Sequence, residues 1–241
     1  MRHLRDLKRC LEIEDWTTKE TIRRYQKESE LYERSFNLAL DTFHYICKRT
    51  KRKIMDSCGK ELTLLILPRI IQSLQSIRTL TMKGYYYDAS VLERSYFEAV
   101  GMCAYLSLNE EEAKKWGKGG KLGVNSTGLV NWIPKLLVGN LKTDLKPAYW
   151  KLCDYVHNNA KGVLSMVSDW HPEESNLNQE KSRLTLRYAP VFDENKVEIV
   201  SALSTTVCLA MEKIFWNELT KERKDRIEGF IDQYVKEVML A

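Results

Sequence analysis

The chain has 241 residues, of which 44% are hydrophobic and 29% charged, and its formal net charge is +5. Such a composition supports one large domain that buries a sizeable core without disulfides or metal. The first fifteen residues carry charge throughout, unlike a signal peptide, and the most apolar run, 62–71, is half the length of a transmembrane helix. We therefore expect a cytoplasmic protein with no membrane contact.

Cysteine and histidine spacing argues against disulfides and against metal binding. No two cysteines are spaced as C-x-x-C, and reduced thiols are typical of a cytoplasmic protein. The histidines show neither H-x-x-x-H nor E-x-x-H spacing, so we expect no metal and no other cofactor. The residues concerned are Cys10, Cys47, Cys58, Cys103, Cys153 and Cys208, and His44, His157 and His171.

Low glycine and proline content, 11 and 5 residues, favours long helices over many short strands. We expect an all-α helical bundle, with residues 1–17 as an N-terminal arm and 18–241 as a single helical-bundle domain. An alternating pattern around a turn predicts a minor β-hairpin near residues 183–200, although its second run, 196–200, could instead begin the next helix. Apolar periodicity predicts helices at 18–52, 60–83, 86–108, 110–116, 129–138, 146–158, 199–219 and 221–240.

Two segments suggest phosphate binding at first sight. The basic excess lies entirely in residues 1–53, with 14 basic and 9 acidic residues, and ends in the tract 48–53. That tract can attract phosphate, or it can place cations at the negative end of a helix. The glycine-rich stretch 117–123 lacks the Gly-Lys-Ser/Thr pattern of a P-loop and the strand before it, so we interpret it as a surface loop.

The predicted helix 86–108 carries two charges in apolar surroundings. Arg94 and Glu98 are four residues apart, on a face shared with Tyr105, and no charge follows from 99 to 108. Charges at such positions are costly unless they are paired. Either the two form a structural pair, or they make the polar floor of a cleft to which Tyr105 contributes as a ligand-binding residue.

A second polar group follows in the predicted helix 146–158. Asp154 lies three residues before His157, a spacing at which a carboxylate can orient an imidazole for acid–base chemistry. Lys151 and Lys161 flank the pair as candidate ligand-binding residues. The alternative is a histidine that caps or packs the helix end. If this helix lies beside helix 86–108, then Arg94, Glu98, Asp154 and His157 form one pocket with Arg94 suited to an anion.

These two segments carry a resemblance to a known family. Residues 88–99, with Arg-x-x-x-Glu at 94–98, the acidic turn ending in Trp116, and the Tyr149-to-His157 helix are similar to uncharacterised bacterial helical domains related to the HEPN superfamily. The resemblance covers roughly residues 60–165. It implies a bacterial four-helix bundle that binds a nucleotide or RNA, in a stress or phage-defence role.

The sequence departs from the ribonuclease members of that superfamily, which carry Arg four to six residues before His. Here the only basic residue at that spacing before His157 is Lys151, and Lys cannot form the two parallel hydrogen bonds of an Arg guanidinium. An anion or nucleotide pocket tolerates this departure better than ribonuclease activity does. The alternative function is a non-catalytic interaction module, which binds a protein partner or forms a homodimer through its first and last helices while the polar residues are structural.

Overall fold

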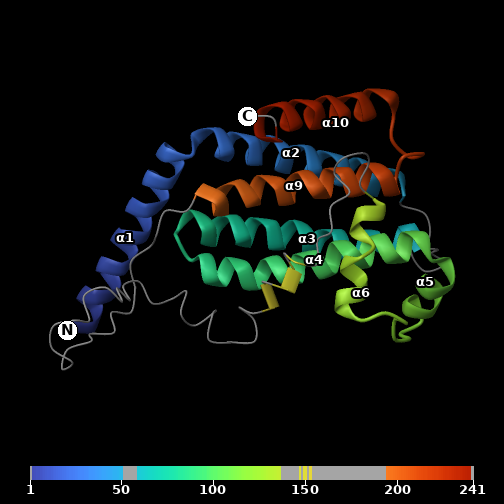
Figure 1. Ribbon diagram of the computed structural model, residues 1–241, viewed down its shortest axis with the longest axis horizontal. Coiled ribbons are helices and arrows are strands. Elements are labelled where there is room, and N and C mark those ends of the chain that lie inside the picture. The colour runs from blue at the N-terminus through green and yellow to red at the C-terminus, as the bar shows by residue number, and fades with distance from the viewer. Residues whose placement is uncertain are drawn as a thin grey trace.

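The computed structural model describes residues 2–50, 59–136, 147, 149, 150, 152, 153 and 194–239, and the described elements are helices without a β-strand. This confirms the all-α bundle. Helices α2, α3, α4 and α9 lie side by side, α10 lies over α2, and α1 projects from one end (Figure 1). The elements are α1 (Arg2–Arg24), α2 (Gln26–Arg49), α3 (Gly59–Met82), α4 (Tyr86–Leu108), α5 (Glu110–Gly117), α6 (Ser126–Val130), η2 (Ile133–Lys135), α9 (Glu194–Ile214), α10 (Lys221–Tyr234) and η5 (Val235–Met239).

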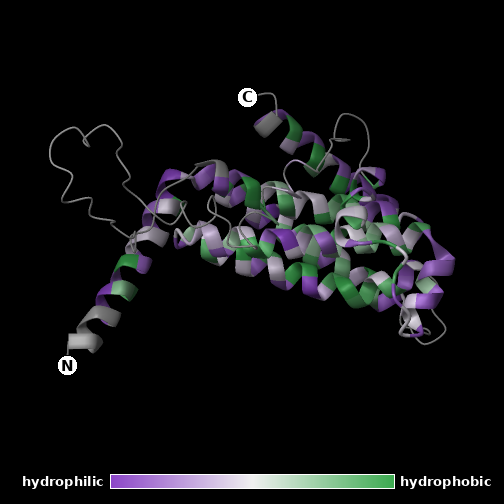
Figure 2. Ribbon diagram, turned by 60° about the horizontal axis from the view of Figure 1, so that its bottom comes forward, coloured by the Kyte–Doolittle hydropathy of each residue, from purple (hydrophilic) through white to green (hydrophobic). Residues whose placement is uncertain are grey.

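Helix α3 lies at the centre of the bundle, where it packs against both α4 and α9. Leu67, Ile70, Leu74 and Ile77 are at most 1% exposed. Spaced i, i+3, i+7 and i+10, they form one apolar stripe that faces the neighbouring helices. Burying each such side chain contributes about 1.5–3 kcal/mol. Figure 2 shows hydrophobic residues gathered where the long helices meet.

The turn between α3 and α4 follows from Gly84, which has φ of 80°. The N–H of Tyr85 donates to the Leu80 carbonyl at 2.8 Å, and the N–H of Gly84 donates to the Thr81 carbonyl at 3.0 Å. These are the two bonds of a Schellman cap, which requires the left-handed conformation that glycine adopts at no steric cost. The cap reverses the chain so that α3 and α4 pack antiparallel.

Buried polar contacts join α9 to the helices that precede it by more than a hundred residues. The Tyr96 hydroxyl donates to the Leu203 carbonyl at 2.6 Å, and the Ser35 and Ser204 hydroxyls bond to each other. Tyr96, Ser35 and Ser204 are all fully buried. Because each group would lose its hydrogen bond if α9 slid along α4 or α2, these contacts fix the register of the bundle.

Helix α10 is held on α2 by ion pairs and by buried apolar side chains. Arg223 and Arg226 donate to one carboxylate oxygen of Asp41 at 2.7 and 2.9 Å. Hydrogen bonding from Arg223 lowers the pKa of Asp41. Ile227 and Phe230 are buried beside these ion pairs, so α10 combines an apolar face with a charged clamp.

The structure corrects two predicted features. The predicted β-hairpin near residues 183–200 is not formed at 196–200: these residues belong to α9, in agreement with the alternative that they begin the next helix, and Val197 and Val200 are buried at helical spacing. The first strand, 183–188, lies outside the described residues. The predicted helix 18–52 is two helices, because Tyr25, with φ −119° and ψ 48°, interrupts it. Since α1 begins at Arg2, it runs through the expected arm, and the domain division remains a prediction.

No helix in the described part of the chain has the length and apolar character that crossing a membrane requires.

Helix α4 meets α6 at a point where only glycine fits. A Cβ at position 101 would lie 2.5 Å from the carbonyl oxygen of Leu129. Backbone cannot withdraw as a flexible side chain does, so we expect Gly101→Ala to destabilise the fold by about 2 kcal/mol, within the range for overpacking. Chemical denaturation monitored by circular dichroism measures this loss.

Gly229 in α10 is the matched control, because a Cβ there meets nothing within 4 Å. We expect Gly229→Ala to stabilise the protein by about 0.5–1 kcal/mol, as for glycine removal from an exposed helix. Equal effects of the two substitutions would show that the α4–α6 contact does not constrain position 101.

Candidate functional site

The two charges of α4 form an ion pair near the protein surface. The Nε of Arg94 donates to Glu98 Oε1 at 3.1 Å, one helical turn away. Their side chains are 20% and 28% exposed. The pair is therefore neither fully buried nor fully solvated, and it retains contact with solvent.

Tyr149 brings a distant segment onto this ion pair. Its hydroxyl donates to Glu98 Oε1 at 2.7 Å, across 51 positions of sequence. Its ring lies 5.9 Å from the Arg94 guanidinium carbon, within the range of a cation–π contact. Tyr149 is 1% exposed, and burial together with the bond to Glu98 raises its pKa to about 12. The hydroxyl thus remains a hydrogen-bond donor at neutral pH.

An exposed aromatic side chain stands next to the buried one. Trp150 is 55% exposed, and its ring meets that of Tyr149 edge-on, with centroids 6.3 Å apart. The Arg94 guanidinium and the Trp150 indole therefore both contact Tyr149. A cation that suits a phosphate and a flat apolar surface that suits a base therefore both lie next to Tyr149.

The structure places only part of the predicted site. Arg94 and Glu98 are together, and Cys153, which immediately precedes Asp154 in the sequence, is helical and buried. Tyr105 lies three turns, about 16 Å, along α4 from Arg94, and its ring packs against Trp132 at 5.1 Å. It is thus not joined to the pair. Lys151, Asp154, His157 and Lys161 lie outside the described residues.

Sequence reasoning missed Tyr149 and Trp150 as site residues. Tyr149 is buried, as expected for a side chain on the apolar face of a helix. The available signal was chemical: a tyrosine in an apolar stripe usually finds a partner for its hydroxyl. Glu98 is an acceptor that also lies on an otherwise apolar stretch, so the two could have been matched.

A buried carboxyl lies on α4, toward α9. Glu93 is 2% exposed, and its Oε1 has no hydrogen-bond partner among the residues that the structure describes. Lys196 lies 3.8 Å from Oε2 and donates to the Ser90 hydroxyl at 2.7 Å. Burial raises the pKa of Glu93, and Lys196 opposes this rise. The cluster ties the start of α9 to α4 and is separate from the Arg94–Glu98 pair.

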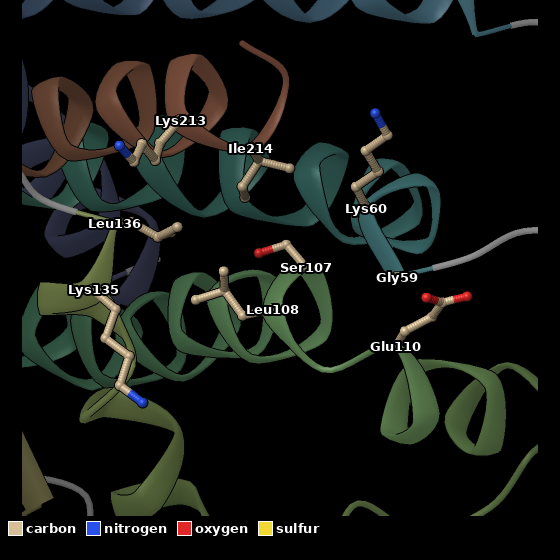
Figure 3. Close-up of a pocket in the computed structure, with 9 residues that line it drawn as sticks. All are labelled: Gly59, Lys60, Ser107, Leu108, Glu110, Lys135, Leu136, Lys213 and Ile214. Carbon is tan, nitrogen blue, oxygen red and sulfur yellow. The ribbon is translucent and has the colours of Figure 1, made fainter. Parts of the chain in front are cut away.

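A cavity of about 280 Å³ opens at the end of the bundle where α3 begins and α4 and α9 end (Figure 3). The lining residues come from α3, α4, α5, η2 and α9 and include three lysines and one glutamate. They are Gly59, Lys60, Ser107, Leu108, Glu110, Lys135, Leu136, Lys213 and Ile214. The cavity lies about 20 Å along α4 from Arg94, so it is a separate site.

No group of three or more His, Cys, Asp or Glu side chains within the described ranges is arranged to hold a metal ion. Comparison of the sequence with protein-family models and with curated proteins, and of the structure with solved structures, finds no match.

The side chain of Glu212 on α9 predicts how the stability of the fold depends on pH. It is 9% exposed, and burial raises its pKa to about 7, with Glu228 of α10 adding repulsion and Lys213 and Lys224 opposing it. A carboxyl whose pKa is higher in the folded state stabilises the fold at low pH. We expect this contribution to be lost as pH rises from about 4.5 to about 7.

The substitution Glu212→Gln isolates this effect, because glutamine is neutral at every pH. Thermal unfolding of both proteins between pH 5 and pH 8 should show the melting temperature of the wild type falling relative to that of Glu212→Gln. A constant difference across this range would contradict the assigned pKa.

Proposed function

We propose that the protein binds a nucleotide, free or within single-stranded RNA, at a site formed by Arg94, Glu98, Tyr149 and Trp150. The observation that carries the proposal is the hydrogen bond from Tyr149 to Glu98 at 2.7 Å. It joins Tyr149 to the Arg94–Glu98 pair, and this supports the hypothesis that the predicted helix 146–158 contributes to the same pocket. The resemblance to HEPN proteins points to the same ligand class.

The residues of this site have separate roles. Glu98 accepts hydrogen bonds from both Arg94 and Tyr149 and so orients the Arg94 guanidinium. Arg94, partly exposed, contacts a phosphate, since guanidinium groups bind phosphate oxygens through paired N–H donors. Trp150 stacks on the base, a contact worth about 1–3 kcal/mol per base. Binding follows from these contacts alone and requires no catalytic step.

Arg94→Met tests the proposal, because methionine keeps much of the apolar stem and removes the charge. We expect the affinity for a short fluorescein-labelled single-stranded RNA, measured by fluorescence anisotropy, to fall at least tenfold, as expected for one lost charge-assisted contact. Nucleotide-induced shifts of the melting temperature should decrease in parallel.

Arg78→Met is the matched control. The Arg78 guanidinium also lies over a tyrosine ring, 5.2 Å from the Tyr32 centroid, and also pairs with a glutamate, Glu33, at 3.3 Å. The Arg78→Met variant should bind RNA with the same affinity as the wild type. Equal losses in the two variants would indicate nonspecific charge attraction. A lower melting temperature for Arg94→Met with unchanged RNA affinity would instead assign the pair a structural role.

A second candidate function, self-association or binding of a protein partner, is supported by α1. Leu11 and Ile22 are 52% and 41% exposed on this helix. Eleven residues apart, they lie about 20° apart around the helix axis and so share one face. Helix α1 also extends away from the bundle (Figure 1), which leaves this face accessible.

Light scattering on the purified protein tests this second function. If α1 mediates self-association, the wild type should have the mass of an oligomer, and Leu11→Glu should reduce it to that of a monomer. Leu65→Glu is the control, because Leu65 is also 52% exposed but lies on α3. A monomeric wild type would exclude a homodimer.

A further inference from the structure

Positive charge gathers where the first turns of α10 lie on the end of α2 (Figure 1). Of the basic tract 48–53, the structure describes Lys48 and Arg49, which are exposed in the last turn of α2. Together with Asp41 and Tyr45 they are spaced i, i+4, i+7 and i+8, so the four side chains share one face of the helix. This is the face of α2 that meets α10.

Two arginines of α10 project onto this face. Arg223 and Arg226 both donate to Asp41 Oδ2, at 2.7 and 2.9 Å. The guanidinium carbon of Arg223 lies 4.1 Å from the centroid of the Tyr45 ring. That of Arg49 lies 5.4 Å from the same centroid, and Arg49 Nη1 donates to the Tyr45 hydroxyl. One tyrosine ring therefore holds guanidinium groups from two helices close together.

The cations of this surface, here called the basic cluster, are Lys48, Arg49, Arg223 and Arg226. Among the described side chains, Asp41 is the only carboxylate that forms an ion pair with them. Four positive charges against one negative charge leave the cluster at +3. Asp225 does not reduce this charge locally, because a separation of two residues turns it about 200° around α10 from Arg223. The Arg226 side chain is 60% exposed, so the cluster is accessible to a partner.

Helix dipoles account for only part of the basic cluster. Lys48 and Arg49 lie at the negative end of α2, where cations are favoured. Arg223 lies in the first turn of α10, the positive end of that helix, where cations are disfavoured. The Asp41 carboxylate compensates this arginine and Arg226 together. The dipoles therefore do not explain why four cations meet at this place, whereas a bound polyanion would.

The surroundings of the basic cluster favour a nucleic acid over a membrane or a protein. In the described part of the chain, none of the exposed large hydrophobic side chains lies on α2 or α10. Membrane-bound helices insert such side chains, and the centres of protein interfaces are enriched in aromatic ones. Guanidinium groups instead match phosphate oxygens, and binding to a phosphate backbone is mainly electrostatic.

We infer that the basic cluster binds the phosphate backbone of a nucleic acid, independently of base sequence. A duplex carries one negative charge per about 1.7 Å of its axis, so several phosphates can meet the cluster at once. The cluster contains no residue of the proposed nucleotide site, and the inference does not rest on that proposal. A duplex also keeps its bases stacked, so it does not offer Trp150 a free base.

Fluorescence anisotropy with short fluorescein-labelled duplexes, one of DNA and one of RNA, tests the inference. The wild type should bind with a Kd of roughly 1–100 µM near physiological salt, the range of sequence-independent binding. Two duplexes of unrelated sequence should bind equally. The logarithm of the affinity should fall linearly with the logarithm of the KCl concentration, because phosphate contacts release counterions.

Substitutions from both helices identify the surface. The double variant Lys48→Gln/Arg49→Gln should weaken duplex binding about tenfold and make the salt slope shallower by about 2, one for each lost phosphate contact. Arg226→Gln, from α10, should make the slope shallower by about 1. Circular dichroism should show both variants folded.

Lys118→Gln/Lys121→Gln is the matched control for the double variant. It removes the same charge from the glycine-rich loop 117–123, where both lysines are exposed and, within the described residues, form no ion pair. Its affinity and salt slope should equal those of the wild type. An equal loss in this control would show that net charge alone attracts the duplex.

Three further results would overturn the inference: no binding of either duplex at low salt, an unchanged salt slope in both cluster variants, or tighter binding to phosphatidylcholine–phosphatidylserine vesicles than to either duplex. Arg94→Met should bind duplexes with the affinity of the wild type. Lys48→Gln/Arg49→Gln should retain any nucleotide-induced shift of the melting temperature. Either proposal can therefore fail without the other.

Discussion

Helix α3 presents a wide apolar face, and the bundle is arranged so that this face meets protein instead of water. Helix α4 covers one side of it through the capped turn at Gly84, and α9 covers another. Dispersion and hydrophobic burial do not specify how far α9 slides along this face. Directional bonds do: the Tyr96 hydroxyl reaches the Leu203 carbonyl, and Ser35 reaches Ser204. Burial thus determines which helices associate, and these bonds determine their alignment.

Much of the helix pattern was predictable because local signals mark its ends. Gly84 and Asn109 delimit α4, whose observed bounds are those predicted, and α3 differs by one residue at each end. The break at Tyr25 was not predictable, since no glycine or proline marks it. Residues 196–200 were predicted as a strand or as the start of a helix, because their short alternation of apolar residues fits both. Burial of Val197 and Val200 by neighbouring helices decides between the two.

Local sequence patterns predict one part of the candidate site but not the other. The Arg94–Glu98 pair follows from i, i+4 spacing in an apolar stretch. The contact with Tyr149 spans 51 positions, and no local pattern encodes such a contact. The lysine cavity was missed because Lys60, Lys135 and Lys213 are each ordinary in sequence. Only α3, η2 and α9, once placed together by the fold, bring them to the lining of one cavity.

The order of helices along the chain has a consequence for synthesis. Helix α9 begins 112 positions after α3 ends. At about 5–20 residues per second, the ribosome completes α3 roughly 5–20 s before α9 begins to emerge. Throughout that interval the α9-facing side chains of α3, among the most apolar of the chain, lack their final cover. The bundle can therefore close only after residues 194–214 have been synthesised, so that translation sets the earliest time at which α3 is fully covered.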